Sequence, residues 1–211
     1  MKIVNFIFLS LLVSCAHTSY PKDWWTHVDP KLAKSWEILP QSAQEGEVIL
    51  SKRTELGILS NFASTPFVLD GRTYASIEGF WQSLKYPEDK KDPRFKLMKW
   101  PYTRKQVSQM VGFEAKRAGD VASRVMKKHN INWVSYNNLK MVYREPGFSP
   151  FYTLIKRATV AKVEQNKRVK EILLSTGDLK LLPDHKQKVG VPKAWRYYDI
   201  YMNLRTKYLK L

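Results

Sequence analysis

The chain has 211 residues and a formal net charge of +17 at pH 7, with 36 Lys and Arg against 19 Asp and Glu. The length suits one good-sized domain, and an aromatic content of 13% with ordinary Gly and Pro excludes a disordered chain. The charge predicts anionic partners such as nucleic acid, nucleotides, phosphorylated sugars or acidic lipid, and charge repulsion that keeps the protein soluble is the simpler alternative.

The first residues have the pattern of an export signal. Lys2 precedes a mainly apolar run over 3–13, which is shorter than the about 20 residues that a membrane-spanning helix needs and fits a secretory signal. The run ends in Leu-Val-Ser-Cys, which resembles a bacterial lipobox, so 1–14 is the predicted signal and Cys15 the predicted lipidation site. With Ala16 after the cysteine, this resemblance implies a lipid-anchored protein of the outer membrane.

Residues 15–46 are predicted to be a tether and a lead-in helix before the main domain, which is assigned to 47–211. The adjacent Trp24 and Trp25 are expected to pack on that domain, because tryptophan is usually well buried. A helical pattern follows through Ala33, Trp36 and Leu39, and a strand is predicted at 47–50.

The stretch 58–87 combines a hairpin and a short helix. Asp70-Gly71 lies between two strand-like runs, and this dipeptide favours a two-residue turn because glycine accepts a positive φ. Ser76 is a candidate N-cap for a helix over 77–85. On that helix the polar side chains Glu78, Gln82 and Lys85 share one stripe beside an apolar stripe. A solvated Glu-to-Lys face is the plain interpretation of this pattern.

A resemblance favours a different interpretation. The stretch carries Ser60-Asn61-Phe62, Pro66-Phe67, Asp70-Gly71, Ser76-Ile77-Glu78, and Gln82 three residues before Lys85. This combination resembles the signature of the NADAR (YbiA-like, DUF1768) family. The resemblance extends over roughly 47–205 and implies an α+β, mostly helical, YbiA-like fold, with a small sheet or β-hairpin packed against several helices.

The rest of the chain is predicted to be mostly helical. Helices are expected from Asp92-Pro93, over 102–110, over 112–128 and over 193–209. The run 161–178 closely resembles a family segment, with Asn166 as an expected N-cap and Gly177 as an expected C-cap. The sequence departs from the family pattern over 140–160, and again after Asp184, where no Trp-Gly follows.

The resemblance implies cleavage of an N-glycosidic bond in a ribose phosphate or ADP-ribose-type substrate. Lys85 is then the candidate nucleophile, forming a Schiff base with the sugar, and Glu78 the candidate acid/base. A lysine amine attacks only when it is neutral, which an apolar cleft beside Trp81 and Leu84 would promote. The remaining candidate substrate-binding residues are Asn61, Phe62, Trp81, Gln82, Trp133, Asp184 and Trp195.

Several other chemistries lack their motifs. The four histidines share no metal-ligand spacing, and the sequence has no phosphate-binding glycine loop and no Gly-x-Ser-x-Gly elbow. We therefore expect no metal and no cofactor. The expected partners are a nucleotide or ADP-ribose-type substrate, including ADP-ribosylated nucleic acid, and a membrane reached through the lipid anchor, with the protein acting as a monomer. Two other functions remain open: a catalytically impaired surface module that binds nucleotide, ADP-ribose or nucleic acid, and a basic lipoprotein that contacts anionic polymers.

Overall fold

The computed structural model describes residues 20–210, so the predicted signal over 1–14 and the predicted lipidation site Cys15 lie outside the described residues. The α-helices are α1 (Ile77–Ser83), α2 (Arg104–Ser108), α3 (Gly112–Lys128), α4 (Pro150–Gln165), α5 (Lys167–Ser175) and α6 (Tyr197–Leu209). The strands are β1 (Glu47–Ile49), β2 (Phe67–Leu69), β3 (Arg72–Tyr74), β4 (Trp133–Tyr136), β5 (Leu139–Val142) and β6 (Lys180–Leu182). The expected α+β, mostly helical class is confirmed.

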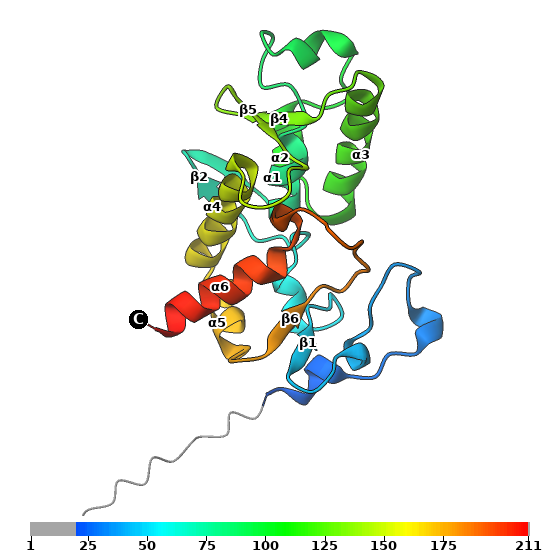
Figure 1. Cartoon of the computed structure of the whole chain (residues 1–211), viewed down its shortest axis with the longest axis vertical. Coiled ribbons are helices and arrows are strands. Elements are labelled where there is room, and N and C mark those ends of the chain that lie inside the picture. The colour runs from blue at the N-terminus through cyan, green and yellow to red at the C-terminus, as the bar shows by residue number, and fades with distance from the viewer. Residues whose placement is uncertain (1–19, 211) are drawn as a thin grey trace, which may run out of the picture.

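The strands pair two by two, and each pair has a separate role. β1 and β6 run parallel, with Glu47 opposite Lys180, so strands from the two ends of the domain lie side by side (Figure 1). β2 and β3 form the predicted hairpin, in which Asp70 and Gly71 both have positive φ, 48° and 74°. This geometry matches the right-handed twist of the flanking strands. The hairpin leads directly to Ser76 and α1.

Helix α1 lies in the middle of the upper part of the molecule in Figure 1, with α2, α3 and the β4–β5 hairpin around it. It contacts α2, α3 and α4, and all of its residues are buried. Ser76 caps it as predicted, because its hydroxyl accepts a hydrogen bond from the Gly79 amide at 2.9 Å. The helix ends at Ser83, two residues before the predicted end, and Leu84 and Lys85 form the turn that follows it. A polar stripe on a helix this deeply buried cannot be a solvated face.

Residues 20–46 differ from the predicted lead-in helix. They form three short 3-10 helices, Lys22–Trp25, Pro30–Leu32 and Pro40–Ser42. Proline at the start of the second and third fixes the entry of each turn but does not extend it. Trp24 is fully buried, as expected, and its indole donates to Glu55 at 3.0 Å. The described part of this segment is therefore packed against the domain.

The β4–β5 hairpin was not predicted. Its turn residues Asn137 and Asn138 both have positive φ, 50° and 62°, and asparagine tolerates this backbone region better than most residues. The region after residue 86 was expected to be mostly helical, and the strands at 133–136 and 139–142 depart from that expectation.

Candidate active site

One cavity of about 570 Å³ brings together most of the predicted site residues. Its size falls in the range typical of small-molecule sites, about 300–1,000 Å³. It is lined by side chains from α1, α3, the turn before the β2–β3 hairpin, the segment after β5, and the chain between β6 and α6. The predicted residues in its lining are Asn61, Phe62, Glu78, Trp81, Gln82, Lys85, Asp184 and Trp195.

Two glycines allow α1 to present its polar stripe to this cavity. A Cβ on Gly79 would lie 2.3 Å from the Met110 carbonyl oxygen, so α1 packs directly on the backbone between α2 and α3. A Cβ on Gly119 of α3 would lie 1.7 Å from the Gln82 side-chain oxygen. The Gln82 side chain therefore occupies the space that a larger residue at position 119 would fill.

Glu78 is a buried carboxyl group with a single side-chain partner. Its residue is 8% exposed, and Gln82 donates to its Oε1 at 2.7 Å. Burial raises the pKa of Glu78, while the hydrogen bond from Gln82 and the charge on Lys85 act in the opposite direction. The pKa of Glu78 therefore lies above its ordinary value, so this carboxyl group keeps its proton to higher pH than an exposed glutamate, as a general acid requires.

Lys85 is a buried amine with its pKa displaced toward neutrality. The residue is 7% exposed, and its Nζ donates to the Ser123 hydroxyl on α3 at 2.9 Å. Burial lowers the pKa of Lys85 to about 8, against the attraction of Glu78 and Asp120 and with help from the positive charges of Lys116 and Arg144. A substantial share of this amine is neutral near physiological pH, as nucleophilic attack requires.

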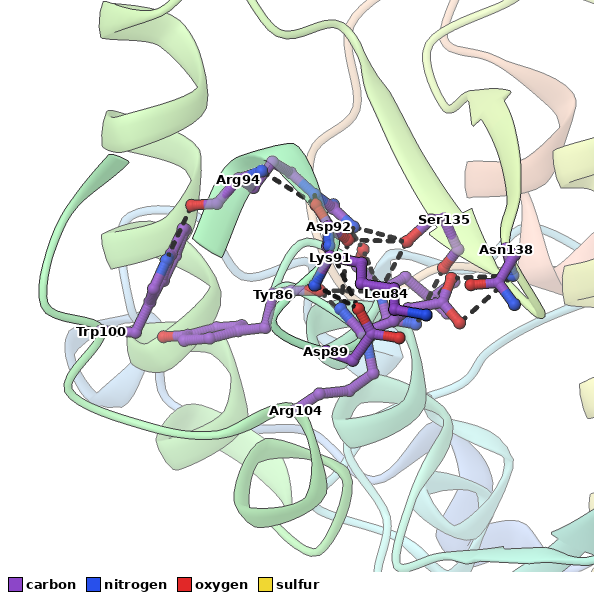
Figure 2. A network of polar contacts seen from close by, with 11 residues as sticks. Leu84, Tyr86, Asp89, Lys91, Asp92, Arg94, Trp100, Arg104, Ser135 and Asn138 are labelled. Carbon is purple, nitrogen blue, oxygen red and sulfur yellow. Dashed lines mark hydrogen bonds and ion pairs between the residues drawn. The ribbon is translucent and has the colours of Figure 1, made fainter. Parts of the chain in front are cut away.

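Two arginines hold the backbone on both sides of Lys85 (Figure 2). Arg94 Nη1 and Arg104 Nη2 both donate to the Leu84 carbonyl, at 2.9 and 3.0 Å. Arg104 also donates to the Tyr86 carbonyl, at 2.7 Å from Nη2 and 3.0 Å from Nε. These bonds satisfy carbonyls at the carboxyl end of α1 that the helix itself leaves open, and they fix the direction in which Lys85 leaves the helix.

The same network neutralises its own charges. Asp92 accepts from Arg94 Nη2 at 2.7 Å and from Nε at 3.0 Å. Burial alone would raise the pKa of Asp92, but hydrogen bonds from the side chain and backbone of Arg94 lower it to about 2. Arg104 lies 3.6 Å from Glu88. Figure 2 shows these groups converging on Ser135 of β4.

A buried lysine fixes the turn that carries Asn61. Lys162 of α4 is fully buried and donates to the carbonyls of Ile58 and Ser60, at 2.8 Å each. Burial lowers the pKa of Lys162 to about 7. The carbonyl of Asn61 in turn accepts from the Glu78 amide at 2.9 Å, so this turn and the start of α1 are held together.

Aromatic rings form one end of the cavity. Phe62 and Phe113 meet edge to face with ring centroids 5.1 Å apart, and Trp36 lies 6.1 Å from Phe113. The Lys52 ammonium is 5.6 Å from the Trp36 ring and 5.3 Å from the Phe62 ring. The flat faces of these rings can stack with a planar ligand ring.

Asp184 takes part in local pairing. Its carboxylate pairs with Lys52 and lies 3.2 Å from His185 Nδ1. Burial would raise the pKa of Asp184, but its hydrogen bonds with His185 and Lys52 lower it. The chain here is fixed to the N-terminal segment, since the Ile38 amide donates to the Asp184 carbonyl at 2.8 Å and the Lys186 amide to the Trp36 carbonyl at 3.0 Å. These bonds explain how Trp36 reaches the cavity.

Trp133 does not lie in the cavity with the other predicted site residues. It was expected in the substrate site, but it lies on β4 and lines a different depression, together with Asp92 and Lys140. Its ring stacks between cations, with the Arg94 guanidinium at 4.5 Å and the Lys140 ammonium at 4.4 Å from the centroid. Because Trp133 lies on strand β4 and contacts Arg94, it belongs with the structural arginine network.

Sequence reasoning missed several lining residues: Trp36, Lys52, Phe113, Lys116, Asp120, Ser123, Tyr143 and Arg144. Those on α3 show a signal in hindsight, because Phe113, Lys116, Asp120 and Ser123 follow at steps of three and four and share a helix face. The others come from loops and from the segment after β5, where no periodic pattern marks them.

Two other features are absent from the part of the chain that the structure describes. In residues 20–210 no helix is long and apolar enough to cross a membrane. Over the same residues, no cluster of three or more His, Cys, Asp or Glu side chains is placed to hold a metal ion.

The fold and cavity define a class: an α+β domain in which a short buried helix presents a carboxyl group and an amine to one aromatic-walled cavity. Comparison with known sequences gives the family. The profile described as Bacteriophage protein GP30.3 matches residues 53–188, more than half of the chain, so the chain belongs to that family. No curated protein matches it. The NMR structure of the E. coli protein YbiA is similar, with 21% identity, 80% of this chain and 88% of that chain covered, and a TM-score of 0.48.

Proposed function

We propose that this protein is an N-glycosidase that hydrolyses the N-glycosidic bond of a ribose phosphate or ADP-ribose-type substrate. One observation carries the proposal: Glu78 and Lys85 line the same cavity with their pKa values shifted in opposite directions, upward for the carboxyl group and downward for the amine. Environments that separate the pKa values of two titratable groups in this way are a mark of acid–base chemistry.

The first step joins the sugar to the enzyme. The neutral amine of Lys85 attacks C1 of the ribose, and the bond between C1 and the base nitrogen breaks. The electron pair goes to that nitrogen, which takes the proton of the Glu78 carboxylic acid. Opening of the ribose ring then gives a Schiff base between C1 and Lys85, with the proton of the amine passing to the ring oxygen.

The second step releases the sugar. Glu78, now a carboxylate, accepts a proton from water as the water adds to the Schiff base carbon. The new C1 hydroxyl then gives its proton to the Lys85 nitrogen while the C1–N bond breaks with its electron pair going to nitrogen, which leaves the free sugar as an aldehyde and returns the amine. The balance is one water consumed and one base released, with Glu78 and Lys85 restored.

Two buried acceptors are suited to the sugar hydroxyls. The side-chain oxygens of Asn61 and Gln82 are buried and have no partner among the described residues, and both residues line the cavity. An unsatisfied buried acceptor costs about 1–3 kcal/mol, and a bound ribose would supply the missing donors. We place the base against Phe62, Phe113 and Trp36, where the rings offer stacking faces.

The test is release of free base from a panel of NAD, ADP-ribose conjugates, ADP-ribosylated DNA and phosphoribosyl pyrimidines, with chromatographic detection. Borohydride reduction during turnover should leave a sugar adduct on Lys85, located by mass spectrometry. The variant Lys156→Ala, which removes an exposed lysine of α4, is the matched control and should keep the adduct. Turnover without an adduct on Lys85 would remove it from the role of nucleophile.

A second function, capture of a nucleotide without cleavage, is favoured by one contact. Asp184 is engaged by both Lys52 and His185, so its carboxylate is not free for a catalytic role at this edge of the cavity. If ADP-ribose binds and no member of the panel releases base, the protein is a binding module. If base is released, that alternative is excluded.

A further inference from the structure

A second groove lies next to the part of the cavity that holds Lys85. This groove, about 600 Å³, shares the lining residues Asp120, Ser123, Tyr143 and Arg144 with the cavity. It adds Arg124 and Lys127 from the next turn of α3. Ser123 is the residue that contacts the Lys85 amine, so the second groove begins where the proposed chemistry takes place.

Helix α3 sets the order of features along the two cavities. Phe113 stands at the aromatic end, Ser123 beside Lys85, and Lys127 in the second groove. At about 1.5 Å per residue, Phe113 and Ser123 are roughly 15 Å apart along the axis and Ser123 and Lys127 roughly 6 Å. Arg124 and Lys127 therefore lie within about one turn beyond Ser123, on the side of α3 away from Phe113.

The charge in this groove is uncompensated. Arg124, Lys127 and Arg144 form no ion pair with any other described residue. Asp120 is the acidic residue of the lining, and it pairs with Lys116 at 2.9 Å. Arg144 packs on Tyr143, with its guanidinium 5.3 Å from the ring centroid, and reaches both cavities.

We propose that Arg124, Lys127 and Arg144 form a phosphate-binding subsite for the phosphate carried by the sugar that Lys85 attacks. The inference rests on the proposed function for the position of that sugar. With a base at the aromatic end and the reacting sugar carbon beside Lys85, the sugar-borne phosphate is directed into the second groove. Guanidinium and ammonium groups bind phosphate through charge-assisted hydrogen bonds.

The test uses binding, so it does not depend on turnover. Affinities for ribose 5-phosphate, ribose, ADP-ribose and a short single-stranded DNA are measured by calorimetry at two salt concentrations. The variant Arg124→Gln/Lys127→Gln changes two exposed cations of the groove. The control Lys156→Gln/Lys207→Gln changes two exposed cations on α4 and α6 and removes the same charge. Thermal unfolding followed by circular dichroism checks that both variants are folded.

Wild type and control should bind ribose 5-phosphate at least about tenfold more tightly than ribose, and the groove variant should lose most of this preference. The measurements with ADP-ribose and with DNA show which kind of molecule carries the phosphate. A free nucleotide is indicated if ADP-ribose binds and DNA does not compete. A nucleic-acid strand is indicated if DNA competes and its salt dependence weakens in the groove variant by roughly one to two units of slope.

Equal binding of ribose and ribose 5-phosphate by wild type, or equal affinities for the groove variant and the control, would overturn the subsite. Failure of the subsite can be distinguished from failure of the proposed glycosidase function. Loss of the phosphate preference in the groove variant supports the subsite even if no base is ever released. Release of base with an unaltered phosphate preference in that variant removes the subsite and leaves the glycosidase.

Discussion

Two buried cations near the carboxyl end of α1, Arg94 and Lys85, have opposite surroundings. Arg94, fully buried, is matched by the Asp92 carboxylate, the Leu84 carbonyl and the Ser135 hydroxyl. Lys85, almost as buried, has one neutral hydroxyl as its hydrogen-bond partner, and its pKa falls to about 8. A buried cation with a full set of acceptors stays charged, whereas a buried amine with too few acceptors has a lowered pKa and becomes a better nucleophile. The difference separates a structural cation from a candidate catalytic one within ten residues of sequence.

The largest expected effect follows from removing the amine. Lys85→Met should lower turnover by about 10⁴-fold or more, since the nucleophile is lost. It should leave the free energy of unfolding unchanged or raised, because an incompletely compensated buried charge is replaced by an apolar chain of similar length. Base release and urea unfolding measure the two effects, with Lys156→Met as control. A variant that unfolds more easily would mean that Lys85 is structural.

Glu78→Gln tests the carboxyl group. Loss of a general acid should lower kcat by about 10²- to 10⁴-fold. Because the charge of Glu78 raises the pKa of Lys85, the substitution should also lower that pKa further below about 8. Because the first step needs Lys85 neutral and Glu78 protonated, kcat/KM of the wild type should be bell-shaped in pH, with one of its two breaks at about 8.

The pH dependence of lysine labelling, followed by mass spectrometry of the peptide containing Lys85, reports the shift in both proteins. An unchanged labelling midpoint in Glu78→Gln would show that the two groups do not interact.

Arg94→Met should destabilise the protein, whereas Lys85→Met should not. It leaves Asp92 buried without its cation and the Leu84 carbonyl with one donor fewer, so the free energy of unfolding should fall by about 3–5 kcal/mol. Chemical denaturation measures this change. Arg94→Lys should recover only part of it, because an ammonium cannot reproduce the bidentate contact with Asp92. An unchanged free energy of unfolding in Arg94→Met would show that Arg94 is not a structural cation and that it does not differ from Lys85 in this respect.

Gly119→Ala tests how the packing of α3 against α1 positions Gln82 and Glu78. Its Cβ would lie 1.7 Å from the Gln82 side-chain oxygen, so Gln82 must move and its hydrogen bond to Glu78 is disturbed. We expect a rise in KM and a loss of about 1–3 kcal/mol in unfolding free energy. Gly190→Ala, at a loop position with open space around it, is not a matched control because its φ is +78°. Ala118→Ser, at a buried site on the same helix, is the better comparison.

The last prediction concerns Lys162 and the pH dependence of stability. Its pKa is about 7 in the folded protein and about 10.4 in an unfolded chain. Between these values the unfolded state binds more protons, so this residue makes the free energy of unfolding rise as pH increases from 7 to 10. The difference in stability between wild type and Lys162→Met should grow over that interval. A pH-independent difference would show that Lys162 keeps its ordinary pKa.

Local sequence determined much of the site. The Asp70-Gly71 turn, the Ser76 cap and the shared stripe of Glu78, Gln82 and Lys85 were all predictable, because each depends on residues within a few positions of one another. Helix α3 was predicted with its observed bounds for the same reason. The β4–β5 hairpin was missed, since its Asn-Asn turn is a weaker signal than Asn-Gly and its strands are short.

Only the tertiary structure decided which distant residues complete the site. Trp36, Ser123 and Arg144 reach the cavity from three separate segments, and the clamp on Leu84 and Tyr86 comes from Arg94 and Arg104. The pKa of Lys85 depends on burial by all of these segments at once. Backbone angles and caps are set by neighbours in sequence, whereas desolvation and long-range charge are set by neighbours in space. The sequence by itself therefore specified which groups stand on α1, and folding specified whether they can react.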